Sequence, residues 1–273
     1  MRVHSFDYLV ELPSELVRLD CAALHLARDT YADIEVPAYL AKLDMMAEEV
    51  AALRPGLDAT LRYAAMRQVL VDGYDLRGDE ADYYHPQNGY LNRVIDRSRG
   101  MPITVSLVWL EVARRLKWPV HGLAMPGHFL IRFDDPDRTV ICDTFRAGRT
   151  VNQSDCQKIL DHCFDGKVKL KPCFLEPVDT RVILARMLNN LRSIYLVNQS
   201  WPHLENILQR LCALEPEQGR HLQELAALHY RQGDVRLAYA HLAHYVRTKP
   251  QAEDLLLVRQ RLNHLEAACA ALN

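Results

Sequence analysis

Apolar side chains recur every three or four residues along much of the chain, and this spacing predicts helices. In the clearest early case, from Val36 to Leu53, Leu43, Met46 and Val50 share one helical face and Pro37 suits the first turn. Other helices are expected at residues 16–27, 57–71, 103–116 and 152–162. The helix at 103–116 has almost no polar face, so we expect it to be buried on most sides.

A different pattern follows Pro119 and predicts strands. Residues 120–123, 128–133 and 139–143 are short runs rich in β-branched and aromatic side chains. Pro126-Gly127 separates the first two runs, and Asp-Asp-Pro-Asp separates the next two. Because these residues favour turns, the segment is predicted to form an antiparallel meander.

A repeat marks the C-terminal part of the chain. Two helical hairpins end at Pro216 and Pro250, which are 34 residues apart, the period of the tetratricopeptide repeat. Ala238 stands where the helices of the second hairpin should cross closely, and a capping helix is expected at 252–272. The expected fold is α+β and mostly helical: a core with a short antiparallel sheet, followed by an all-α region of tetratricopeptide-type helical hairpins. The sequence thus predicts two domains, at residues 1–177 and 178–273.

The composition excludes several classes of protein. The chain has 33 Lys and Arg against 35 Asp and Glu, a net charge of −2, and 49% hydrophobic residues, which is typical of a globular protein. A charge so close to zero gives no electrostatic argument for nucleic acid or an anionic membrane as a partner. The seven cysteines are widely spaced without a Cys-x-x-Cys motif, so we expect neither disulfides nor a zinc site. Without a signal-like or membrane-spanning segment, a cytoplasmic protein is expected.

One set of residues has the types and positions that catalysis requires. His128 lies on the second expected strand and Asp143 on the third, and antiparallel strands joined by a turn can place such residues side by side. An Asp beside a His can fix its tautomer and stabilise the imidazolium. A nucleophile at the N-terminus of the 103–116 helix would complete a catalytic triad.

Four sequence blocks around these residues resemble the SirB branch of the transglutaminase-like superfamily. They are Tyr84-His85-Pro86-Gln87-Asn88, Arg99-Gly100-Met101-Pro102-Ile103-Thr104, the LEVARRL run that ends at Leu116, and Pro126-Gly127-His128-Phe129. Members of this branch commonly join a transglutaminase-like core to C-terminal tetratricopeptide repeats. The resemblance implies a papain-like core whose active members use a Cys at the start of the central helix, a His on the next strand and an Asp on the strand after it.

According to this resemblance, two of these three residues have counterparts in the sequence. His128 matches the His and Asp143 matches the Asp, but the Cys of active relatives falls where Pro102, Ile103 and Thr104 stand. Thr104 is therefore a candidate nucleophile, and its alternative role is that of a hydrogen-bonding residue in the first helical turn.

Thiols elsewhere in the sequence are poor substitutes for the missing Cys. Cys142 directly precedes Asp143 on an expected strand, so the two side chains should face opposite ways. Cys163 lies on a later segment. We therefore expect no thiol chemistry.

Further candidate ligand contacts lie outside the triad. His85 and Asn88 could line the mouth of a cleft, or else belong to a polar loop that caps the next helix. Tyr195 and Tyr230 could face a concave groove in the repeats, although most residues at such spacings pack between helices. The spacing of His, Cys, Asp and Glu indicates no metal site, and no motif indicates a cofactor.

These observations support two functions of different classes. The first is a non-catalytic scaffold or binding protein, a pseudoenzyme that takes a protein or peptide partner. The second is a cysteine-independent acyl-transfer or hydrolytic enzyme in which His128, beside Asp143, acts as a general base on water or on Thr104. The missing Cys favours binding and the retained pair favours catalysis; of the two, we expect binding.

Overall fold

The computed structural model describes residues 6–271, which form two compact units. Unit 1 ends at Met187 and unit 2 begins at Leu188, so the boundary between them lies within a helix. Leu272, the expected end of the capping helix, lies outside the described residues. The fold is α+β and mostly helical, as predicted.

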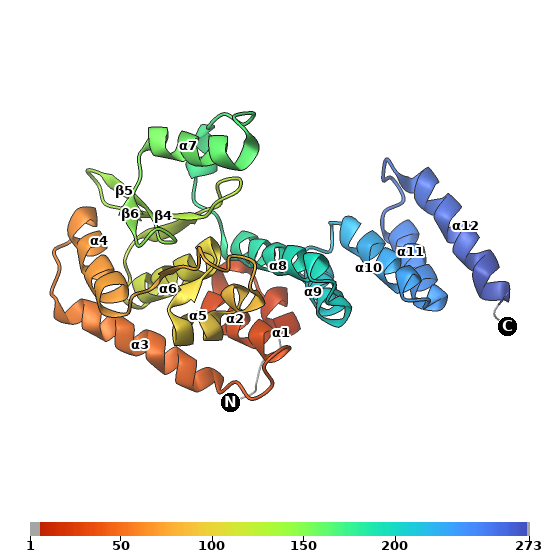
Figure 1. The fold of residues 1–273 in the computed structure, drawn as a ribbon, viewed down its shortest axis with the longest axis horizontal. Coiled ribbons are helices and arrows are strands. Elements are labelled where there is room, and N and C mark those ends of the chain that lie inside the picture. Colours follow the sequence, from red (N-terminus) through yellow and green to blue (C-terminus); the bar gives the residue numbers. More distant parts are fainter. Residues whose placement is uncertain (1–5, 272–273) are drawn as a thin grey trace. The chain divides into compact units, whose positions relative to one another are not determined.

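Unit 1 consists of helices around a small four-stranded sheet (Figure 1). Its helices are α1 (Phe6–Glu11), α2 (Leu19–Arg28), α3 (Val36–Ala52), α4 (Ala59–Arg67), α5 (Leu91–Arg97), α6 (Pro102–Arg115), α7 (Gln153–Phe164) and the first part of α8 (Thr180–Val197). Short 3-10 helices occur at Ser14–Leu16, Pro86–Gly89 and Pro172–Leu175. A π-helical segment at Gln68–Gly73 directly follows α4, so the helix expected at 57–71 changes its winding after Arg67.

Four antiparallel strands follow one another across the sheet in chain order. They are β3 (Val120–Leu123), β4 (Leu130–Asp134), β5 (Thr139–Asp143) and β6 (Arg149–Thr150). The predicted meander is confirmed. One part of the prediction is wrong: His128 lies before β4 and not on it, because Gly127 adopts a left-handed φ of +72° and turns the chain there. A separate parallel pair, β1 (Arg77–Gly78) with β2 (Arg99–Gly100), was not predicted.

Helices α6 and α7 cover opposite faces of the four-stranded sheet (Figure 1). Ile159 and Leu160 of α7 belong to the same buried cluster as Leu130 of β4. On the other face, Trp109 of α6 meets Phe133 of β4 edge to face, with ring centroids 6.3 Å apart. The sheet is therefore the middle layer of unit 1, and α6 is buried along most of its length, as its apolar sequence predicted.

Unit 2 contains the helical hairpins that the repeat predicted. After α8 the helices are α9 (Trp201–Leu214), α10 (Arg220–Arg231), α11 (Val235–Thr248) and α12 (Leu255–Ala271). Pro216 and Pro250 follow the ends of α9 and α11. Ala238 of α11 is fully buried beside Leu242, in the core that α10, α11 and α12 share. Gln199 supplies a left-handed φ of +52° in the turn between α8 and α9, where the repeat lacks its usual glycine.

Candidate functional site

The start of α6 lies beside the end of β5, which is the arrangement that a catalytic triad on this fold requires. Ser106 of α6 and Thr144, directly after β5, share a buried hydrogen bond of 2.7 Å. Pro102, Ile103 and Thr104, where the family resemblance places the Cys of active relatives, are all buried. In the part of the chain that the structure describes, the N-terminus of α6 therefore presents no thiol.

The hydroxyl of Thr104 is engaged with the backbone. Oγ1 lies 2.5 Å from the carbonyl oxygen of Asn88 and 3.1 Å from that of Met101, and it donates to these acceptors. A hydroxyl has one hydrogen, so these two acceptors use its whole donor capacity. Thr104 thereby ties the first turn of α6 to the preceding loop.

Asn88 is fully buried, and its side-chain amide and its carbonyl are all hydrogen-bonded. Its Nδ2 donates to the carbonyl oxygen of Asp82 over 2.7 Å, and its Oδ1 accepts from Arg97 over 2.9 Å. Nearby, Nδ1 of His85 accepts a 3.2 Å hydrogen bond from the backbone of Gln87 and caps the short helix that follows. Both Asn88 and His85 thus occupy the loop-ordering role that is the alternative to a cleft contact.

His128 and Asp143 lie side by side, and we call them the His–Asp pair. Nε2 of His128 is 2.9 Å from Oδ1 of Asp143; the Asp143 side chain is fully buried, and the His128 side chain is 11% exposed. The two side chains are close, but their geometry is not that of a hydrogen bond. Nε2 of His128 and Oδ2 of Asp143 therefore have no hydrogen-bond partner among the described residues. The ring of Phe145 meets the imidazole edge-on at a centroid distance of 6.1 Å. Since Nε2 faces the carboxylate, Nδ1 is the ring nitrogen left for a ligand or a proton.

The turn before β4 fixes the place of His128. Gly127 has a left-handed φ of +72°, and a Cβ there would lie 2.9 Å from the Cβ and Sγ atoms of Cys163. Arg186 of α8 donates hydrogen bonds to the carbonyl oxygens of Met125 and His128 over 2.6 and 2.8 Å. Glycine is therefore required in the Pro-Gly-His-Phe block for backbone conformation and for space.

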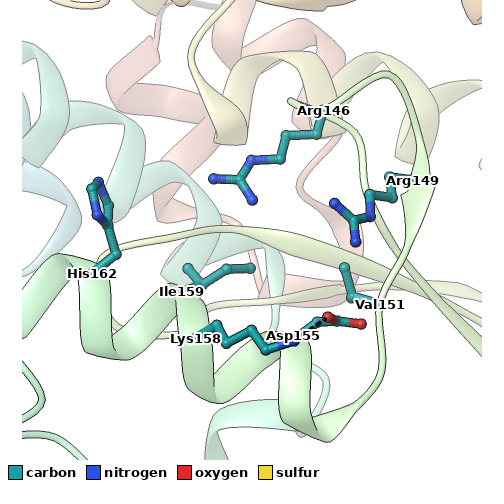
Figure 2. A pocket seen from close by; sticks show the side chains of 7 residues that line it. All are labelled: Arg146, Arg149, Val151, Asp155, Lys158, Ile159 and His162. Atoms are coloured by element: carbon teal, nitrogen blue, oxygen red, sulfur yellow. Dashed lines mark hydrogen bonds and ion pairs between the residues drawn. The ribbon is translucent and has the colours of Figure 1, made fainter.

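A basic pocket of about 140 Å³ opens beyond the end of β5 (Figure 2). Arg146 and Arg149 line it from the segment after β5, and Lys158 and His162 line it from α7. Its one acidic lining residue is Asp155, whose pKa is lowered because its carboxylate accepts a hydrogen bond from the backbone of Asn152. We refer to this hollow as the basic pocket.

Arg146 joins the basic pocket to the His–Asp pair. Its backbone N–H lies 3.3 Å from Oδ1 of Asp143 and donates to it, and its Nε lies 3.9 Å from Oδ2 of the same carboxylate. The basic residues were not predicted as a site from the sequence. The sequence pattern that could have indicated this site is weak. It consists of Arg146 and Arg149, three residues apart after Asp143, and of Lys158 and His162, four residues apart on a helix.

Two cysteines neighbour the His–Asp pair in sequence or in space. Cys142 is fully buried on β5 and, as the residue before Asp143, points to the opposite face of the strand. Burial raises the pKa of the Cys142 thiol well above its usual range. Cys163 is exposed near the end of α7, with Sγ 3.8 Å from the carbonyl oxygen of Gly127. The thiol next in sequence to the pair is thus buried and hard to ionise, and the exposed one lies against the backbone of the turn.

In unit 2, the two tyrosines predicted as ligand contacts have different environments. Tyr230 is 52% exposed and lines, with Leu257, Arg261 and His264, a groove of about 480 Å³ that we call the unit 2 groove. Tyr195 is 3% exposed. Tyr230 is therefore accessible to a ligand, whereas Tyr195 packs inside the helices.

Two other kinds of site are absent from residues 6–271. From Phe6 to Ala271, no helix has the length and apolar character that a membrane span requires. Within the same residues, no group of three or more His, Cys, Asp and Glu side chains is arranged to hold a metal ion.

Comparisons with known proteins agree with this architecture. Residues 37–189 match the transglutaminase-like superfamily and residues 191–263 the tetratricopeptide repeat. A UPF0162 protein of Xylella fastidiosa is 30% identical over 94% of this chain and 93% of its own length. The chain therefore belongs to the transglutaminase-like superfamily and to the UPF0162 proteins.

The chain is also similar to one human protein in sequence and to one solved structure in fold, at lower identity. Human F-box only protein 21 is 28% identical over 62% of this chain and 28% of its own length. The crystal structure of menin superposes with a TM-score of 0.43 at 11% identity, covering 96% of this chain and 70% of menin.

Proposed function

We propose that this chain, as a SirB-type member of its superfamily, is a non-catalytic protein that binds a peptide segment of a partner through the unit 2 groove. The observation that carries the proposal is the start of α6. Buried Pro102 and Ile103 stand where active relatives place their Cys, and the hydroxyl of Thr104 is engaged by the Asn88 carbonyl. A pseudoenzyme core joined to binding repeats accounts for these features. The seven free cysteines support a reducing compartment, the cytoplasm.

The unit 2 groove has the chemistry of a peptide site. Tyr230 and Leu257 are 52% and 49% exposed, so they offer apolar surface that a partner can bury. Arg261 and His264 line the same groove and supply hydrogen-bond donors at its side. An amphipathic segment with apolar anchors and an acidic residue fits this combination.

A peptide-display selection on the full-length protein tests the proposal. We expect selected peptides to lose binding to Tyr230→Ala and to Leu257→Ala. The matched control is Leu256→Ala, since Leu256 is 74% exposed, adjacent in sequence and not among the groove residues. Peptides that bind all three variants as tightly as the wild type would place binding elsewhere.

The second candidate is a hydrolytic or acyl-transfer enzyme, and the His–Asp pair is the observation in its favour. With Nε2 of His128 only 2.9 Å from Asp143, Nδ1 could act as a general base on water. Hydrolysis of a fluorogenic ester, or amine incorporation into casein, by the wild type but not by His128→Ala would establish this function. Equal background rates for both proteins would leave binding as the function.

A further inference from the structure

The basic pocket contains more positive charge than its own residues neutralise. Arg146, Arg149 and Lys158 share it with a single carboxylate, that of Asp155. One oxygen of that carboxylate already accepts from the backbone of Asn152, and the other lies 3.5 Å from Lys158. The guanidinium of Arg149 has no hydrogen-bond or ion-pair partner within residues 6–271. An unpaired guanidinium beside two further cations favours an anion in this hollow.

These donors come from two separate elements and meet at the same hollow. Figure 2 shows Arg146 and Arg149 on one side of it and His162 on the other, rising from α7. Val151 and Ile159 supply apolar surface between them. Partial removal of water by such a surface strengthens each interaction between a cation and a bound anion.

We infer that the basic pocket binds the phosphoryl group of a small ligand, with Arg146 and Arg149 as its principal donors and Lys158 as a further cation. Guanidinium groups donate in pairs to phosphate oxygens. Arg146 also faces the carboxylate of Asp143, with Nε 3.9 Å from its Oδ2, so the three cations meet two carboxylates; a phosphoryl group is favoured because its oxygens can accept from both guanidinium groups at once. A volume of about 140 Å³ admits one such group.

The position of this pocket connects the ligand to the His–Asp pair. Arg146, which would hold the phosphoryl group, has Nε 3.9 Å from Oδ2 of Asp143. The anionic end of the ligand would thus lie one side chain away from the pair. The inference concerns unit 1 and is independent of peptide binding in the unit 2 groove.

Calorimetric titration of the full-length protein tests this inference. The probes are inorganic phosphate, glycerol 3-phosphate and acetate at constant ionic strength. We expect saturable binding of both phosphates, with acetate at least about tenfold weaker. Arg149→Ala should weaken phosphate binding by about tenfold or more, since it removes hydrogen bonds from a charged donor to the anion. Arg138→Ala is the control: Arg138 is an exposed arginine just before the start of β5, at the end away from the pocket, and its loss should change the affinity less than about twofold.

Lys158→Ala provides a second variant, because the Lys158 side chain is 73% exposed and its loss should not disturb folding. It should weaken phosphate binding as well, while the unfolding midpoint without phosphate stays unchanged. Several results would overturn the inference: no saturable phosphate binding, acetate binding as tightly as phosphate, or equal losses for Arg149→Ala and Arg138→Ala. Binding of inorganic phosphate without glycerol 3-phosphate would assign the pocket to the free ion and equally overturn the proposed ligand.

Discussion

The hydroxyl of Thr104 donates a hydrogen bond of 2.5 Å to the backbone carbonyl oxygen of Asn88, and both residues are fully buried. The same carbonyl accepts the backbone N–H of Met101 over 3.0 Å. The loop around Asn88 is therefore fastened twice to the start of α6. This relationship gives Thr104 a structural task at the position where the superfamily's chemistry would begin.

Replacing Thr104 by Val tests that task. The variant keeps the shape of the side chain and removes the donor, so we expect it to lower the free energy of unfolding by about 1–2 kcal/mol. Urea denaturation of the wild type and the variant measures the difference. Thr104→Ser, which keeps the hydroxyl, serves as the control for the hydrogen bond. An unchanged stability together with the loss of a hydrolytic activity would instead identify Thr104 as a nucleophile.

The thiols should react according to their exposure and independently of His128. Cys163 and Cys173 are exposed, so brief treatment of the native protein with iodoacetamide should modify them first. Cys142 should resist until the protein unfolds, because burial both shields its thiol and raises its pKa. Burial also raises the pKa of Cys21 and Cys212 to about 11, so these two should react slowly at neutral pH.

Mass spectrometry of alkylated peptides from the wild type and from His128→Ala provides the measurement. The two proteins should give the same order and rates. A Cys163 that reacts rapidly in the wild type and slowly in His128→Ala would show that a thiol works with the imidazole. That result would support catalysis over the binding function.

The sequence predicts some elements of unit 1 better than others. β3 and β5 have the expected bounds: β3 begins directly after Pro119, and β5 begins with three β-branched residues after the Asp-Asp-Pro-Asp turn. The run that contains Leu130 continues back through Phe129 to His128 without a turn residue, so the pattern predicts a strand that begins two residues before β4 does. Only the backbone conformation of Gly127 delays it. The pairing of β1 with β2 involves two residues of each strand, too few to leave any alternating pattern.

The His–Asp pair and the basic pocket likewise differ in how far the sequence predicts them. The proximity of His128 to Asp143 could be inferred from strand order and from the family resemblance. The basic pocket could not, since Arg146, Arg149 and Lys158 individually look like ordinary solvated charges. Which turn of α7 faces the segment after β5 depends on how Ile159 and its neighbours pack on the sheet, and that is a tertiary property.

A buried carboxylate in α6 should make the stability of the protein depend on pH. Glu111 is 3% exposed and pairs with Arg114 and Arg115 at 2.7 and 2.9 Å. Burial, together with the nearby charge of Asp20, raises the pKa of Glu111 from 4.5 to about 7. The folded protein therefore keeps a proton that the unfolded chain releases, and the contribution of Glu111 to stability is lost as the pH rises from about 4.5 to about 7.

Glu111→Gln removes this titration. Its free energy of unfolding should decline less between pH 4.5 and pH 7 than that of the wild type, by on the order of 1–3 kcal/mol. Asp44→Asn is the control, because Asp44 also pairs with Arg115 but is 60% exposed. Parallel pH profiles for the wild type and Glu111→Gln would contradict the raised pKa. Asp20 titrates outside this window, since its pKa is lowered in the fold and its contribution is lost only under more acidic conditions.

Overpacking at Ala238 should destabilise the repeats. Ala238 is fully buried on α11 beside Leu242 and Tyr245, so the larger side chain of Ala238→Leu has no space there. We expect it to lower the free energy of unfolding by about 1–3 kcal/mol. Ala240→Leu is the matched control, because Ala240 is exposed on the same helix and should tolerate the change. Chemical denaturation of the full-length protein, followed through a probe in unit 2, compares the two. Equal effects would mean that the close helix crossing does not lie at Ala238, and the repeat register read from Pro216 and Pro250 would then be wrong.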